Sequence, residues 1–158
     1  MKTMILTDHL SFCDSNYSIF NKVNEIVKSS LEEVSIAPIN ISNKLMELDC
    51  AIMNMSEISS FYNGLLLATT IEQAYEIRSV KSNSQKCLYL WDLDWMYNTI
   101  EYEYIYNILS DKSLHIIVRS ESHDKALQNL CDKYKCTDIM PTFDLENIWN
   151  LLKKTETL

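Results

Sequence analysis

The stretch 86-KCLYLW-91, which leads directly into Asp92-Leu93-Asp94, decides the predicted fold. Its unbroken apolar run from Cys87 to Trp91 is typical of a strand that is buried on both faces of a sheet. A polar segment at 81–85 precedes the run, and two carboxylates follow it. Open α/β sheets hold their ligands at the carboxyl ends of such strands. The stretch therefore predicts a central strand and one edge of a binding site.

Outward from this stretch, short apolar runs alternate with amphipathic segments and brief polar connections. Strands are predicted at 3–6, 34–37 (stopped by Pro38), 50–53, 64–69, 87–91, 114–118 and 137–140. Helices are predicted at 16–30, 42–48 (a short turn), 70–80, from 98 onward, 122–134 and 145–154. Strict alternation of this kind indicates a mostly parallel, Rossmann-like open α/β sheet with helices on both faces. We expect one domain over 1–154 and a frayed tail at 155–158.

Composition narrows the possible partners. The 158 residues are 47% hydrophobic and carry a net charge of −8. The 14 Lys and Arg side chains do not cluster along the sequence, so we expect no nucleic-acid partner. No apolar run approaches the ~20 residues that span a bilayer, and no secretory leader is visible, so we expect no membrane association and a cytoplasmic location.

Cysteine and glycine usage limits the expected cofactors. The five cysteines are widely spaced and contain no Cys-x-x-Cys pair, which favours reduced thiols over a metal site. Gly64 is the single glycine. Both the P-loop and the G-x-G-x-x-G fingerprint need several glycines for close backbone approach to phosphate, so neither is possible. We expect no cofactor.

Polar side chains at predicted strand ends form the candidate ligand site. They supply acids, imidazoles, one fixed cation and a hydroxyl, and they are Asp8, His9, Asp92, Asp94, Arg119, Ser120 and His123. The aspartates could share Mg²⁺ or simply cap the next helix. His9 could act as a general base, and Arg119 with His123 could bind an anion at a helix N-terminus. Ordinary loop polarity and helix capping would produce the same set, so the catalytic residues stay unknown.

Aromatic residues crowd around the acidic pair. Trp91, Trp95 and Tyr97 are the candidate interaction residues. Aromatic rings here could stack on a sugar or base, form a protein-interaction surface, or pack into the core.

Two resemblances add to this interpretation. The strand 114-LHIIV-118 with 119-RSESH-123, followed by a strand at 138–140 and a last helix, resembles the N-terminal, acceptor-binding half of glycosyltransferases built from two Rossmann-like halves. This implies a sugar or nucleotide ligand, although the nucleotide-sugar half is missing. The motif 92-DLD-94 is similar to that of haloacid dehalogenase-like phosphatases, but Trp95 and Met96 replace the small residues expected there. The chain is also similar to small proteins of T4-like cyanobacterial phages, which implies the infected host cytoplasm.

Two functions follow from these observations. The first is a non-enzymatic binding or interaction protein of phage origin, with a protein partner or self-association. The alternative is a degenerate or partner-dependent glycosyltransferase-like domain that binds a sugar or nucleotide at the strand carboxyl ends. The sequence favours the first and leaves open whether the protein is an enzyme.

Overall fold

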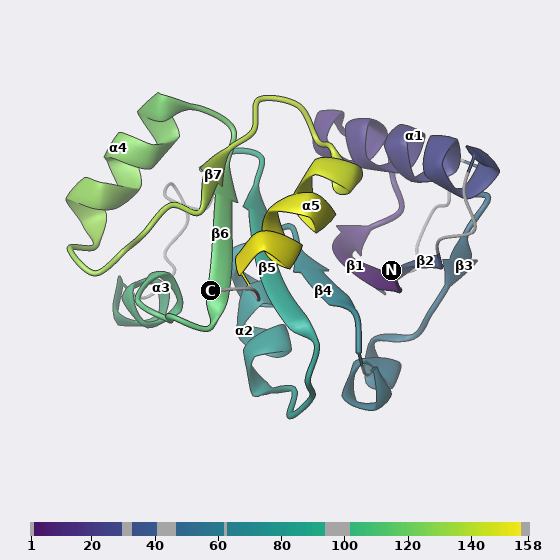
Figure 1. Ribbon diagram of the computed structural model, residues 1–158, viewed down its shortest axis with the longest axis horizontal. Coiled ribbons are helices and arrows are strands. Elements are labelled where there is room, and N and C mark those ends of the chain that lie inside the picture. The colour runs from purple at the N-terminus through teal and green to yellow at the C-terminus, as the bar shows by residue number, and fades with distance from the viewer. Residues whose placement is uncertain (1, 30–32, 41–46, 62, 94–101, 156–158) are drawn as a thin grey trace.

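A computed structural model describes residues 2–29, 33–40, 47–61, 63–93 and 102–155 (Figure 1). Its seven strands form one parallel sheet in the order β3-β2-β1-β4-β5-β6-β7. The strands are β1 (Thr3–His9), β2 (Val34–Asn40), β3 (Ala51–Ile52), β4 (Leu65–Ala68), β5 (Gln85–Leu90), β6 (Leu114–Val118) and β7 (Asp138–Ile139). The helices are α1 (Asp14–Ser29), the 3₁₀ helix η1 (Met55–Ser60), α2 (Ile71–Ser79), α3 (Tyr102–Leu109), α4 (Glu121–Leu130) and α5 (Leu145–Thr155). The predicted Rossmann-like α/β fold is confirmed.

Helices cover both faces of the sheet because the side chains of each strand alternate between two apolar layers. On β5, Cys87 and Tyr89 pack into the layer that contains α1 and α5. Leu88 and Leu90 pack into the opposite layer with α2, α3 and α4. Figure 1 shows α5 crossing in front of the sheet over β5. The central apolar run is therefore buried on both sides, as its sequence predicts.

The order of strands creates a switch point between β1 and β4. From β1 the chain moves outward through β2 and β3, and then returns to the other side of β1 to form β4. Helical connections leave the carboxyl ends of β1 and β4 on opposite faces, which opens a space between the two ends. Ligands of open α/β sheets bind at such points.

Strand boundaries follow the prediction for β6 and depart from it for β2. The predicted stop at Pro38 is wrong, since β2 continues to Asn40 and Pro38 pairs with Thr7 of β1. The neighbouring strand β3 pairs only with Ser35 and Ile36. Pro38 therefore lies past the end of β3, where its missing N–H leaves no ladder hydrogen bond unmade.

Helix starts differ from the predicted ones by one or two residues. Helix α1 begins at Asp14 rather than at residue 16, and its first hydrogen bond runs from Tyr17 N to Cys13 O at 2.8 Å. Helix α4 begins at Glu121 behind its cap Ser120, rather than at residue 122, and ends at Leu130 rather than at 134. The predicted helix start at 98 and most of the predicted turn at 42–48 lie outside the described residues. In the described part of the chain, no helix is long and apolar enough to cross a membrane.

The single glycine is required at the amino end of β4. A Cβ at Gly64 would lie 2.4 Å from the backbone oxygen of Lys2 and 2.9 Å from ring carbons of Phe61. Any other residue would collide with the chain that enters β1. The glycine is thus used for backbone packing at the edge of the sheet opposite the switch point.

Candidate functional site

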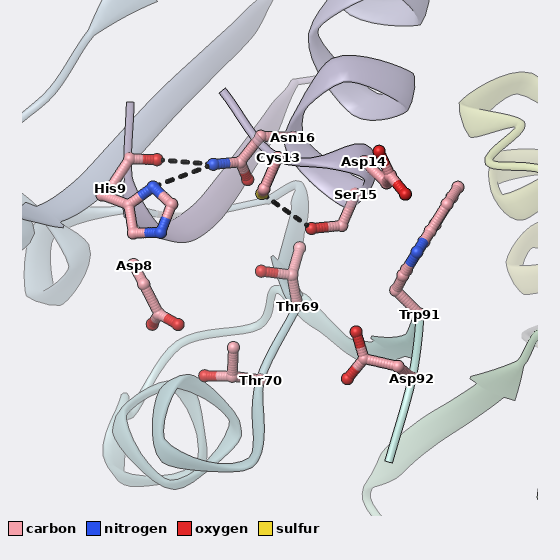
Figure 2. Close-up of a pocket in the computed structure, with 10 residues that line it drawn as sticks. All are labelled: Asp8, His9, Cys13, Asp14, Ser15, Asn16, Thr69, Thr70, Trp91 and Asp92. Carbon is pink, nitrogen blue, oxygen red and sulfur yellow. Dashed lines mark hydrogen bonds between the residues drawn. The ribbon is translucent and has the colours of Figure 1, made fainter. Parts of the chain in front are cut away.

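A crevice of about 610 Å³ opens at the switch point, and we name it the switch-point crevice. Its walls come from the ends of β1, β4 and β5 and from the first turn of α1 (Figure 2). The lining residues are Asp8, His9, Cys13, Asp14, Ser15, Asn16, Thr69, Thr70, Trp91 and Asp92. Since parallel strands end at one edge of the sheet, segments far apart in sequence meet here.

Asn16 holds the β1–α1 loop in place. Its side chain is only 5% exposed. The amide nitrogen Nδ2 donates to the backbone oxygens of His9 at 2.9 Å and Ser11 at 3.0 Å. These bonds satisfy both amide protons and fix the turn that carries His9 above the crevice. The β1–α1 loop contains no glycine and is held instead by the buried side-chain amide of Asn16.

The ring of His9 has two polar neighbours on its Nδ1 side. Nδ1 lies 3.2 Å from Asn16 Nδ2, which can only donate a proton, and beside the hydroxyl of Ser11. With the ring proton on Nε2, Nδ1 can accept a hydrogen bond from the Ser11 hydroxyl. Figure 2 shows Nε2 on the side of the ring away from Asn16. In the tautomer with the proton on Nε2, His9 presents an N–H donor to the crevice.

Gln73 orients the carboxylate of Asp8 on the opposite wall. Its side chain is fully buried, and Nε2 donates to Asp8 Oδ1 at 2.7 Å. Its Oε1 accepts from the backbone N–H groups of Thr69 at 2.8 Å and Thr70 at 3.2 Å. Thr70 caps α2 and completes a capping box with Gln73. One buried amide thus joins the ends of β1, β4 and α2.

The carboxylate of Asp8 is partly removed from water. Burial raises the pKa of Asp8 above its ordinary value, while the Gln73 hydrogen bond opposes this rise and the Glu72 carboxylate adds to it. The charged form is therefore less favourable here than in solution. A ligand that donates hydrogen bonds to Asp8 would stabilise the charged form.

Trp91 closes the crevice at the end of β5. The guanidinium carbon of Arg119 lies 4.2 Å from the centre of its indole ring, a cation–π contact. Tyr89 lies beneath, with its ring centre 6.4 Å from that of Trp91. Arg119 therefore covers one face of the indole and holds the ring in place, and the rest of the ring meets the crevice.

The charge of the crevice is negative. Asp8, Asp14 and Asp92 line it, and no Lys or Arg is among the residues that line it in the described structure. Asp14 lies in the first turn of α1, where the helix dipole favours an anion, so the protein already supplies a negative group there. Residues 2–29, 33–40, 47–61, 63–93 and 102–155 contain no group of three or more His, Cys, Asp or Glu side chains that could hold a metal ion.

The structure brings four predicted site residues together and separates three others. Asp8, His9, Trp91 and Asp92 line the switch-point crevice. Arg119, Ser120 and His123 lie at the end of β6 and are not among its lining residues. Ser120 accepts a hydrogen bond from the amide of His123 at 3.2 Å, which makes it the cap of α4. Asp94, Trp95 and Tyr97 lie outside the described residues, and the predictions made for them stay predictions.

Sequence reasoning missed the two buried amides, Asn16 and Gln73. It also left the hydroxyl of Ser15 out of the site. A signal was present for Gln73, which stands at the third position of a capping box, but its bond to Asp8 spans 65 residues and leaves no local pattern.

Comparison with protein-family models, curated proteins and solved structures found no match to this chain.

Proposed function

We propose that the protein binds a small polyhydroxylated molecule, either a sugar or the sugar part of a nucleoside, in the switch-point crevice. The observation that carries this proposal is the combination of three carboxylates, several hydroxyls and one indole ring in a single open crevice. Carboxylates and hydroxyls accept hydrogen bonds from sugar hydroxyls, and an aromatic ring packs against the apolar face of a sugar. A volume of about 610 Å³ suits a ligand of this size.

Phosphate is a poor ligand for the same crevice. Three carboxylates would repel it, and Asp14 occupies the helix N-terminus that phosphate prefers. The β1–α1 loop also lacks glycine, so its backbone cannot approach a phosphate closely. The proposal therefore keeps the sugar ligand that the glycosyltransferase resemblance implies and drops the nucleotide phosphate. Sugar transfer and a phage origin stay predictions.

Calorimetric titration with glucosamine and with adenosine tests the proposal. At least one of the two should bind saturably, and Trp91→Ala or Asp8→Asn should weaken it about tenfold. Glu57→Gln removes an exposed carboxylate from η1, outside the crevice, and should leave the affinity unchanged. Inorganic phosphate should not compete. Absence of binding by both probes, or competition by phosphate at the crevice, would overturn the proposal.

A protein partner, which the sequence favours, is the second candidate function. Its support is an exposed aromatic pair where α1 begins, next to the crevice. Phe12 is 60% exposed and Tyr17 is 48% exposed, and their ring centres lie 5.4 Å apart. Exposed aromatic pairs are common at interfaces. Self-association that the double variant Phe12→Ser, Tyr17→Ser abolishes in sedimentation velocity would support this role, and a monomeric wild type would count against self-association through this pair.

A further inference from the structure

A second hollow, at the opposite edge of the sheet, has the opposite charge. This cavity of about 410 Å³ lies at the amino end of β6, between the α3–β6 turn and the segment that leads into β7. In Figure 1 this is the lower end of β6, where the chain arrives from α3. Lys112, Lys133 and Lys135 line it together with His115, and we name it the basic cavity. It shares no lining residue with the switch-point crevice.

The three lysines line one hollow, and no described carboxylate pairs with them. In the described part of the chain, none of them forms a hydrogen bond or an ion pair. Lys133 Nζ lies 5.7 Å from the ring centre of Tyr106, a cation–π contact. Three exposed ammonium groups around one hollow give it a positive potential. That potential favours an anion in the cavity.

Asp111, the one carboxylate among the described residues that line the cavity, is already neutralised. Asp111 Oδ2 pairs with the guanidinium Nε of Arg78, and Oδ1 accepts hydrogen bonds from the amide of Ser113 at 2.9 Å and its hydroxyl at 2.7 Å. Burial tends to raise the pKa of Asp111, but Ser113 and Arg78 together hold this pKa below its ordinary value. Asp111 therefore cannot offset the lysines, and the cavity keeps a net positive charge.

The remaining walls are fixed by hydrogen bonds and combine polar residues with the apolar Leu109, Leu114 and Ile116. Thr137 joins β6 through two hydrogen bonds, from its amide to Ile116 O at 2.7 Å and from the Ile116 amide to its hydroxyl at 3.0 Å. Burial lowers the pKa of His115, so its ring is neutral at neutral pH and offers one N–H donor. The cavity is larger than a single phosphate group and leaves room for an organic part.

We propose that the basic cavity is a binding site for a small phosphorylated molecule, whose phosphate is held by Lys112, Lys133 and Lys135. Lysine binds phosphate as a point charge through ammonium hydrogen bonds. A nucleic acid fits less well, because three lysines are a small footprint on a chain of net charge −8. This site is independent of the sugar ligand proposed for the switch-point crevice, so either can fail without the other.

Calorimetric titration with pyrophosphate at low ionic strength tests the inference. Wild-type protein should bind it saturably, and the double variant Lys133→Gln, Lys135→Gln should bind it at least about tenfold more weakly. The control Lys81→Gln, Lys125→Gln removes the same charge from exposed lysines outside the cavity and should bind within about twofold of wild type. Equal melting temperatures of the two variants would show that both fold.

Three results would overturn the inference. The first is absence of saturable binding in wild-type protein. The second is an equal loss of affinity in both double variants, which would indicate general attraction rather than a site. The third is tighter binding of a short single-stranded oligonucleotide than of pyrophosphate, through Lys133 and Lys135. This result would identify the ligand as a nucleic acid rather than a small molecule.

Discussion

The switch-point crevice and the basic cavity lie at opposite edges of one sheet and differ in sign. Among the described residues, three carboxylates and no lysine or arginine line the crevice, whereas three lysines line the cavity around a carboxylate that Arg78 already neutralises. The net charge of −8 belongs to the whole chain and describes the local charge of neither the crevice nor the cavity. Parallel strands send all their carboxyl ends to one edge and all their amino ends to the other, so one small sheet can separate two incompatible ligand chemistries.

The two hollows also differ in how their side chains are held. Buried amides fix the crevice, since Asn16 binds the β1–α1 loop and Gln73 binds Asp8. The lysines of the cavity are exposed and belong to connections between elements. The crevice is therefore organised before any ligand binds, and the cavity adjusts its long side chains around an anion. Substitutions should be more damaging to stability at the amides than at the lysines.

The largest effect on stability is expected at Gly64. This residue lies at the amino edge of the sheet, far from the switch-point crevice, so its substitution tests backbone packing and not ligand binding. Gly64→Ala places a methyl group against the Lys2 carbonyl and should lower the free energy of unfolding by about 2–4 kcal/mol in urea titration. Asn63→Gly, at the adjacent residue of positive φ, should change it by less than about 1 kcal/mol. Wild-type stability in Gly64→Ala would contradict the close approach.

Gln73→Leu should have the next largest effect. It leaves the amides of Thr69 and Thr70 without their acceptor and Asp8 without its donor, and should lower the free energy of unfolding by about 2–3 kcal/mol. Loss of this bond should also raise the pKa of Asp8 further, as measured by NMR titration of the carboxylate. Gln128→Leu removes an exposed hydrogen bond on α4 and serves as the control. An unchanged Asp8 pKa would refute the orienting role of Gln73.

The sequence predicted the elements whose signals are local. The apolar run of β5 and its neighbours β4 and β6 are confirmed. The continuation of β2 through Pro38 was missed. Whether a strand tolerates a proline at this position depends on where the neighbouring strand ends.

The two hollows were predictable to different degrees. Asp8, His9 and Asp92 could be placed at one edge because parallel strands share that edge. The basic cavity was missed because its lysines look scattered along the sequence. Lys112 precedes β6, and Lys133 and Lys135 precede β7, so only the pairing of these strands brings them together.

Two carboxylates, one from each edge, should respond to pH with opposite sign. The folded-state pKa of Asp111 lies below its unfolded value of about 3.9, so its contribution to stability is present above that pH and is lost as the pH falls through the folded pKa. The pKa of Asp8 is raised by burial, so its contribution is present at low pH and is lost as the pH rises through its folded pKa.

Asparagine substitutions make this difference measurable. Asp111→Asn should lower the free energy of unfolding by about 1–2 kcal/mol at neutral pH, and the deficit should shrink in acid. Asp8→Asn should give a small gain at neutral pH that disappears in acid. Urea titrations of both variants at neutral and acidic pH provide the comparison. A deficit of the same size at both pH values for Asp111→Asn would show that its charge is unimportant.

The central claim is that one sheet carries two sites of opposite charge at its two edges. Amide chemical-shift mapping by NMR, with pyrophosphate and then with glucosamine or adenosine, tests it most directly. Pyrophosphate should shift amides near Ser113 and Lys133–Thr137, and the sugar or nucleoside should shift amides near His9, Asn16 and Thr70. Both ligands shifting the same amides, or pyrophosphate shifting those of the switch-point crevice, would contradict the account.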